Sequence, residues 1–327
     1  MTSPKPTHPA PETVLVIVEG KDDLHVSNIE LICRKAKKTL FIFDISHAAL
    51  ANTIINVDGS YFEINNGVSI IKSTQISGVI IRSFFVKFAD KEKALEEKLW
   101  ADDWNQVVKG LLSILVCDGV KMIPSYPQSL VFENKLSFPL ICKIGEFSYP
   151  NTLVSNRKSL LIKKVEDGKN ILKPFSQKKY VIDQIEYGGK VIRITKKLLE
   201  STNNGDSPIL VQNEIDKQFE VRVTTVGRSS FACKIDNQKS DKASLDWRRY
   251  DFDNVPHTSM MLPPEISSGI QKIHNKLNVN YSAIDFAVDV NNEWWFLDFN
   301  PSGQWLWIEK LTTMPITLSI VEYLTGD

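Results

Sequence analysis

The chain has 327 residues, enough for two or three domains at roughly 100–200 residues each. It is 43% hydrophobic and 24% charged, a composition typical of globular proteins that excludes a wholly disordered or collagen-like chain. Lys plus Arg equals Asp plus Glu at 39 each, so the formal net charge is zero. A neutral chain is a poor candidate for non-specific binding to nucleic acid or to an anionic membrane.

The N-terminus carries no targeting signal that we recognise. Residues 1–12 are Pro-rich and polar, without the apolar stretch of a secretory signal, and we expect a loose tail there. No apolar run approaches the roughly 18 residues of a membrane span. The four cysteines are scattered without a CxxC pair, which fits a reducing environment. We therefore expect a cytoplasmic protein.

The first segment, 13–122, alternates strand-like and helix-like patterns. The expected strands are 13–19, 39–45 and 78–82, and the expected helices are 22–38 and 91–115, the second as one long helix or two. Alternation of this kind predicts a βαβ layer with a largely parallel sheet. A GxGxxG sequence is absent, so nothing indicates a dinucleotide site of that type.

The second and third segments, 123–211 and 212–327, are richer in strands. Short strands are expected at 152–154, 170–174 and 208–211, and a hairpin over 180–194 with its turn at Gly188 and Gly189. The last segment predicts a strand at 220–226, a helix at 264–277, two strands at 282–288 and 293–300, and a closing helix at 315–324. The whole reads as an α/β (α+β) protein in three parts.

The most informative stretch is 284–309, IDFAVDVNNEWWFLDFNPSGQWLWIE. Asp298 and Asn300 are two apart on one expected strand, so they point to the same face. A turn at 290–293 would fold that strand against the one that carries Asp285. Two carboxylates and an amide oxygen on one face are ligands suited to Mg²⁺. The alternative is that all three are ordinary strand-end and turn residues.

Three cations and one loop complete the pattern. Lys135 and Lys173 offer point charges for phosphate, and Arg222, in the middle of a strand, offers a planar fork. The alternatives are two surface lysines and a structural ion pair of Arg222. Residues 212–215, QNEI, follow an apolar strand, where backbone groups could pair with adenine, or form an ordinary loop.

Taken in chain order, these pieces resemble the ATP-grasp ligases. The resemblance implies an ATP-grasp fold with an N-terminal βαβ domain, a central subdomain and a C-terminal subdomain. It assigns ATP phosphates to Lys135 and Lys173 and the transferred phosphoryl group to Arg222. The remaining assignments are the adenine hinge (Gln212, Asn213, Ile215), the ribose (Glu214 or Glu220) and two Mg²⁺ ions (Asp285, Asp298, Asn300).

A narrower resemblance, to the microviridin-type or graspetide ligases, comes from three strings: DWR at 246–248, NPSGQWLWIE at 300–309 and MPITLSIVEYL at 314–324. It implies a homodimeric enzyme that binds a precursor peptide through its leader. The core would carry Asp or Glu and Ser, Thr or Lys, joined by ω-ester or ω-amide bonds. Asp246, Arg248 and Ser302 would face the peptide, although Asp246 and Arg248 could simply pair with each other.

The sequence departs from the family pattern in places. Asp298 stands where a Glu is usual, Asn213 stands where a Glu is frequent, and few glycines follow Lys173. Two alternatives therefore stay open. One is another ATP-grasp ligase, joining amino acids to a small acid or to a protein C-terminus. The other is a degenerate nucleotide- or peptide-binding protein without turnover.

Overall fold

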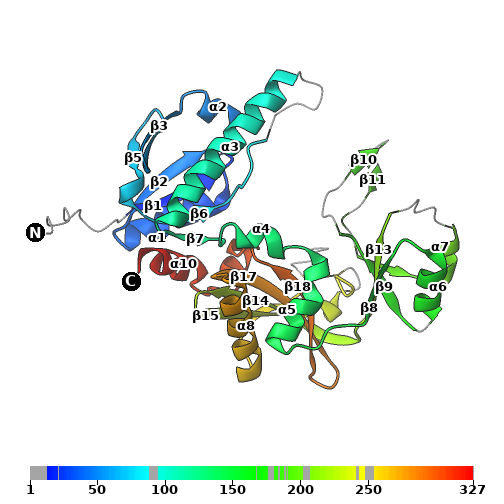
Figure 1. Cartoon of the computed structure of the whole chain (residues 1–327). Helices are drawn as coiled ribbons and strands as arrows, with labels where there is room; N and C mark the ends of the chain where they lie inside the picture. Colours follow the sequence, from blue (N-terminus) through cyan, green and yellow to red (C-terminus); the bar gives the residue numbers. More distant parts are fainter. Residues whose placement is uncertain are drawn as a thin grey trace, which may run out of the picture.

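The computed structural model describes residues 13–20, 22–87, 95–166, 168–175, 180–182, 185–187, 189, 191–201, 207–240, 243–246 and 254–326. The expected loose tail, 1–12, lies outside them. Figure 1 shows an N-terminal part in blue and cyan, a central part in green, and a C-terminal part in yellow to red between the two. No helix in the described ranges is long and apolar enough to cross a membrane. Independent domains at the expected boundaries stay a prediction.

The N-terminal part is built on a parallel sheet with strand order β2-β1-β6-β7. Its strands are β1 (Thr13–Val18), β2 (Thr39–Asp44), β6 (Ile76–Ile81) and β7 (Lys121–Ile123). Helix α1 (Leu24–Lys35) connects β1 to β2, and α3 (Leu95–Cys117) leads from β6 to β7. The predicted βαβ layer is confirmed. Its strands read as unbroken apolar runs because the sheet is covered on both faces.

The C-terminal helix α10 (Ile316–Thr325) covers one face of this N-terminal sheet. Val14 of β1 packs in a core with α1 and α10, whereas Leu15 points to the opposite face, toward α3. Gly78 in β6 permits the close approach, because a Cβ there would lie 2.6 Å from the Cβ of Leu324. The two ends of the sequence therefore share one core.

A three-stranded antiparallel meander, which the sequence patterns did not predict, packs beside α3. Its strands are β3 (Ile54–Asp58), β4 (Tyr61–Asn65) and β5 (Ile70–Lys72), preceded by the short helix α2 (His47–Leu50). Phe62 and Ile64 point inward and alternate with polar residues. That alternation was the available signal.

The central part is a four-stranded antiparallel sheet of order β12-β9-β13-β8. Its strands are β8 (Thr152–Ser155), β9 (Asn170–Lys173), β12 (Ile192–Ile194) and β13 (Ile209–Asn213). Helices α6 (Lys158–Glu166) and α7 (Lys196–Ser201) pack on it through a small apolar core. The expected strand over 208–211 runs two residues further, so Gln212 and Asn213 belong to β13.

The expected hairpin turn at Gly188 and Gly189 is wrong. Strand β10 (Tyr180–Ile182) pairs with β11 (Ile185–Tyr187), whereas β12 pairs with β9, so no hairpin joins the two expected runs across the glycine pair. Gly189, with φ at +72°, follows the hairpin and precedes β12. Gly188 lies outside the described residues.

The C-terminal part is a five-stranded antiparallel sheet of order β16-β15-β14-β17-β18. Its strands are β14 (Lys217–Val226), β15 (Ser229–Ile235), β16 (His257–Met260), β17 (Tyr281–Asp289) and β18 (Trp294–Asn300). Helices α5 (Phe138–Gly145) and α8 (Pro264–Leu277) cover one face (Figure 1). The helix expected at 264–277 and the strands expected at 220–226, 282–288 and 293–300 are confirmed.

Helices α5 and α8 approach each other at two glycines. A Cβ on Gly269 of α8 would lie 2.4 Å from the carbonyl oxygen of Gly145 and 2.5 Å from the ring of Phe147. Backbone atoms cannot move aside as a flexible side chain can. The contact therefore fixes how closely α8 packs against α5 on the C-terminal sheet.

We expect Gly269→Ala to lower the free energy of unfolding by roughly 1–3 kcal/mol, because the extra methyl group overpacks this contact. Gly110→Ala is the matched control. Gly110 lies in the exposed part of α3 with no atom within 4 Å of an added Cβ, and Ala should stabilise that helix by roughly 0.5–1 kcal/mol. Thermal and urea unfolding measure both changes. Equal stabilisation of the two variants would contradict the close packing.

Candidate functional site

A pocket that is partly open to solvent lies between the central and C-terminal sheets. Its walls come from β9 and β13 on one side and from β14, β17 and β18 on the other. The predicted site residues that line it are Lys135, Lys173, Gln212, Asn213, Glu214, Ile215, Glu220, Asp246, Asp285 and Asp298. Side chains scattered over the sequence thus line one concave site.

The backbone just after β13 leaves one N–H group, that of Ile215, available to hydrogen-bond a planar heterocycle. The N–H of Asn213 donates to the carbonyl of Asn151 at 3.0 Å, and that of Glu214 to the carbonyl of Lys169 at 3.0 Å. Among the described residues, no acceptor pairs with the N–H of Ile215. A heterocycle such as adenine, with ring nitrogens as acceptors, fits that position.

Gln212 supplies a second unsatisfied group at the same end. Its side chain is 1% exposed and donates from Nε2 to Oγ1 of Thr152 at 2.8 Å. Its Oε1 is buried without a hydrogen-bond partner. A buried acceptor without a donor is costly, so a ligand amino group or a water is expected to satisfy it. The neighbouring Asn213 is held by Lys164, whose Nζ lies 2.6 Å from its Oδ1.

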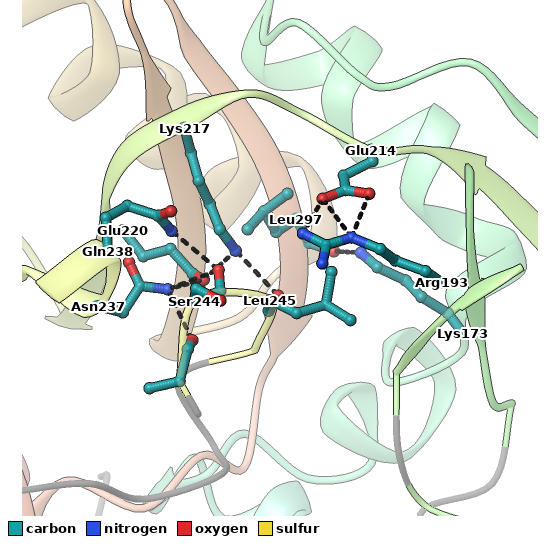
Figure 2. A network of polar contacts seen from close by, with 11 residues as sticks. Lys173, Arg193, Glu214, Lys217, Glu220, Asn237, Gln238, Ser244, Leu245 and Leu297 are labelled. Carbon is teal, nitrogen blue, oxygen red and sulfur yellow. Dashed lines mark hydrogen bonds and ion pairs between the residues drawn. The ribbon is translucent and has the colours of Figure 1, made fainter. Parts of the chain in front are cut away.

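Figure 2 shows the two candidate ribose residues, and they differ in their partners. Glu214 forms a bidentate ion pair with Arg193 of β12, with three N–O distances of 2.7–3.0 Å. Glu220 is 3% exposed and accepts from Lys217 Nζ at 2.5 Å and from Asn237 Nδ2 at 2.7 Å. Glu214, at the exposed side of the pocket, is therefore the better placed of the two for ribose hydroxyls.

A β-bulge in β18 positions the first phosphate-binding candidate. Residues 296 and 298 pair with successive residues of β17, so Leu297 is left over. Its carbonyl oxygen accepts from Nζ of Lys173 at 3.0 Å, which ties β9 of the central sheet to β18 (Figure 2). Lys135 begins a short 3₁₀ turn, and its Nζ lies 3.5 Å from the carbonyl of Phe175. Both ammonium groups thus stand at the junction of the two sheets.

The metal-ligand candidates lie on the face of the C-terminal sheet opposite α8. Ile284 and Phe286 of β17 point into the core under α8, so Asp285 between them points to the other face. Asp285 lies opposite Asp298 in the β17–β18 register, as the turn at 290–293 predicted. Asn300 follows two residues later, opposite Ala283.

Burial raises the pKa of Asp285 to about 6; the charge of Arg222 opposes the shift, and the neighbouring Asp298 adds to it. Two carboxylates at this spacing repel each other in a poorly solvated place. A divalent cation relieves that repulsion, and carboxylate and amide oxygens are ligands that Mg²⁺ accepts. No three His, Cys, Asp or Glu side chains form a further metal cluster in the part of the chain that the structure describes. The donor set therefore fits Mg²⁺ rather than zinc.

Arg222 lies behind Asp285 rather than on the pocket wall. Its Nη1 lies 3.0 Å from both carboxylate oxygens of Asp285, and both side chains are 7% exposed. A Cβ at Gly303 would lie 2.6 Å from Nη2 of Arg222, so only glycine lets this loop pack on the guanidinium. The ion pair that the sequence left open is present. A contact with a transferred phosphoryl group stays a prediction and requires Asp285 to share its charge with a metal.

One carboxylate near the metal-ligand candidates escaped the sequence reading. Partial burial raises the pKa of Glu133, and Asp298 adds to the shift, whereas Lys135 and a hydrogen bond with Ser302 oppose it. Glu133 precedes Lys135 by two residues in the string FENK, which was the available signal. Ser302 also donates from its N–H and Oγ to Asn300 Oδ1, at 3.0 and 3.2 Å.

The loop expected to face the peptide is tied to the pocket floor. Lys217 Nζ donates to the carbonyl of Leu245 at 2.9 Å, and Asn237 Nδ2 donates to that of Ala243 at 3.2 Å. Asp246, next in sequence, lines the pocket. Arg248 lies outside the described residues, so its expected role and its pairing with Asp246 stay predictions.

A scan against known protein families and a search of curated proteins both find no match. Solved structures do match. Macrocyclase MdnC from Microcystis aeruginosa MRC, bound with precursor peptide MdnA, superposes with a TM-score of 0.81 at 22% identity, over 96% of this chain and 99% of that one. A RiPP-associated ATP-grasp ligase of Chryseobacterium gregarium, in complex with ADP and a leader and core peptide, gives 0.78 at 20% identity, over 96% and 97%.

The chain has the ATP-grasp fold. The resemblance inferred from the sequence is thereby confirmed at the level of fold. D-alanyl-alanine synthetase A of Vibrio cholerae gives a lower TM-score of 0.58 at 12% identity, over 97% of this chain and 98% of that one. Within this fold, the pocket between the two antiparallel sheets is the candidate functional site.

We expect Lys173→Met to weaken binding of Mg²⁺-AMPPNP by roughly 10- to 100-fold, because a charged hydrogen bond to phosphate is lost. Isothermal titration calorimetry measures the change. The matched control is Lys169→Met, an exposed lysine just before β9 that is absent from the pocket wall. Equal affinities of the two variants would remove Lys173 from the phosphate site.

Proposed function

We propose that this protein is an ATP-dependent ligase that activates Asp or Glu side chains of a ribosomal precursor peptide. The activated carboxyl would be joined to a Ser or Thr hydroxyl or a Lys amine of the same peptide, forming ω-ester or ω-amide rings. The observation that carries the proposal is the pocket itself. It brings two lysines and two cross-strand carboxylates together within the ATP-grasp fold.

The proposed reaction has two steps. A carboxylate oxygen of the peptide attacks the γ-phosphorus of ATP, and ADP leaves, which gives an acyl phosphate. A hydroxyl or amine of the peptide then attacks the acyl carbon, and phosphate leaves with the bonding electrons. The peptide loses one water for each bond formed. This chemistry needs no covalent enzyme nucleophile, only positioning and charge stabilisation.

Each group of pocket residues has a part in this proposal. The Ile215 N–H and Gln212 Oε1 bind adenine, Glu214 binds ribose, and Lys135 and Lys173 bind phosphates. Asp285, Asp298 and Asn300 hold Mg²⁺, two ions in this proposal, whose charge neutralises the phosphate oxygens when bound. Arg222 supports the transferred phosphoryl group once its ion pair with Asp285 loosens. Asp246, Arg248 and Ser302 face the peptide.

Peptide-bound neighbours favour this proposal over its alternatives. The chain is more similar in structure to MdnC, with a TM-score of 0.81, than to the Vibrio synthetase, with 0.58. A ligase acting on a small acid or a protein C-terminus, and a binding protein without turnover, are the competing proposals. We further propose a cytoplasmic homodimer divided at 13–122, 123–211 and 212–327.

The direct test is to incubate the protein with Mg²⁺-ATP and short peptides encoded beside its gene that carry Asp or Glu together with Ser, Thr or Lys. Mass spectrometry is expected to show the loss of one water per crosslink, with one ADP released for each. An omitted-ATP reaction is the control. Unchanged peptide masses together with intact ATP would sink the enzyme proposal, whereas ADP release with a free amino acid as acceptor would favour another ATP-grasp reaction.

We expect Asp298→Ala and Asn300→Ala to abolish this ATP turnover while circular dichroism and melting temperature stay close to wild type. Asp298→Glu is expected to retain turnover, because the longer carboxylate still reaches a metal ion. Asp102→Ala, in the exposed face of α3, removes one acidic charge elsewhere and serves as the control. Full turnover in either alanine variant would exclude that residue from the metal site.

A further inference from the structure

A second set of polar side chains lies outside the nucleotide pocket, at the carboxyl edge of the N-terminal parallel sheet. Strand β1 lies between β2 and β6 in this sheet, so the chain leaves β1 and β6 in the crevice where strand order reverses. Ligands of open parallel sheets bind at such a crevice. Arg82 follows β6 directly, and Asp23 begins α1 after β1.

Arg82 is held in one orientation by groups from three elements. Its Nε donates to Asp23 Oδ2 at 3.1 Å, and its guanidinium carbon lies 5.3 Å from the ring centre of Trp305. Asp23 Oδ1 also accepts from the N–H of His25 at 2.8 Å, which caps α1. Trp305 is fixed in turn by a hydrogen bond from Nε1 to Thr317 Oγ1 at 2.9 Å. This is the arrangement of a preorganised arginine rather than of a surface arginine.

The two terminal NH₂ groups of the Arg82 guanidinium, Nη1 and Nη2, have no partners among the described residues. Its side chain is only 8% exposed, yet among the described residues Nη1 and Nη2 form no hydrogen bond. Neither amine is among the fully buried unpaired atoms, so both reach the surface of the crevice. A guanidinium offers donors and no acceptor, in a fork that matches a carboxylate or a phosphate.

The groups around Arg82 add to its preference for an anion. His25 Nδ1 lies 2.9 Å from Asp23 Oδ1, and its Nε2 is buried without a partner. Burial, followed by the charges of Arg82 and Lys310, lowers the pKa of His25 to about 4, although Asp23 opposes the shift. Asp23 is thus shared between Arg82 and a neutral imidazole. Lys310 lies close enough to His25 to bring a second positive charge to this edge of the sheet.

Arg82 also stands close to the proposed reaction centre. Trp305 lies 5.9 Å from the ring of Tyr281, and the Tyr281 hydroxyl donates to the carbonyl of Gly303, which packs on Arg222. Burial raises the pKa of Tyr281, and the charges of Arg222 and Arg82 both lower it, so both guanidinium groups act on the same hydroxyl. Arg82 does not line the nucleotide pocket. It therefore lies outside the candidate nucleotide site.

We propose that Arg82, at the edge of the N-terminal sheet, binds a side-chain carboxylate of the peptide substrate. Tyr281 and Trp305 lie between Arg82 and Arg222. This inference rests on the proposed function, because it names the part of the substrate that the crevice recognises. Asp23 and Trp305 are positioning residues: they fix the guanidinium so that its two free amines meet both carboxylate oxygens. An amide in place of the carboxylate would offer one acceptor and a mismatched donor.

The first test needs no turnover. In the full chain with ¹⁵N-labelled arginine and Mg²⁺-ADP, the Arg82 side-chain signals, assigned with Arg82→Lys, are followed during titration with N-acetylglutamate N-methylamide. The signals are expected to shift and saturate with this carboxylate and to stay in place with the corresponding glutamine compound. Unchanged signals, or equal shifts with both compounds, would overturn the proposal. Shifts caused by Mg²⁺-ATP alone would assign Arg82 to the nucleotide instead, which also overturns it.

The second test uses any peptide that becomes crosslinked. Arg82→Gln is expected to lower kcat/KM for the peptide by roughly 10- to 100-fold and to leave KM for ATP unchanged. Arg82→Lys, which keeps the charge without the fork, should lose less. Asp23→Asn keeps the helix cap but not the orienting charge, so it should lower the same parameter.

Arg34→Gln removes an exposed arginine of α1 and should have no effect. Equal peptide kinetics for Arg82→Gln and Arg34→Gln would overturn the proposal. If the wild-type protein crosslinks no peptide, the proposed function fails, and the titration alone decides whether the crevice binds a carboxylate.

Discussion

The pair of carboxylates at Asp285 and Asp298 is the constraint on which the rest of the site depends. The β17–β18 register places them opposite each other, and Asp285 is only 5% exposed, so a second negative charge beside it is costly. Arg222 compensates one of them from behind. The requirement that remains is for cationic charge from the pocket side, and that requirement explains why lysines from two other segments converge there.

The backbone is shaped to keep these charges on one face. The bulge at Leu297 lets Phe296 and Phe299 both enter the core under α8, although they are three residues apart. Asp298 and Asn300 consequently stay on the polar face. The same bulge frees the carbonyl that receives Lys173, so one irregularity in β18 both orients a metal-ligand candidate and joins the two sheets of the pocket.

Sequence patterns predicted the parts of the site that depend on local geometry. The spacing of Asp298 and Asn300 and the turn after Asp289 were enough to give the face and the partner strand, because strand alternation and a short turn leave little freedom. Partners brought by distant segments were not predictable. Arg193 pairs with Glu214 from a different strand of the central sheet, and nothing in the sequence around either residue points to the other. The hairpin over 180–187 shows the same limit, because a glycine pair indicates a turn without saying which strands it joins.

The shared core of β1 and α10 has a consequence for how the protein is made. One face of the first strand is covered only in part, by α1, until Ile316, Ile320 and Leu324 of α10 are synthesised and complete the cover. Synthesis from the N-terminus allows the meander and α3 to close the other face early. The first sheet to leave the ribosome is therefore the last to be completed, and the emerging chain must keep an apolar surface out of non-native contacts throughout translation.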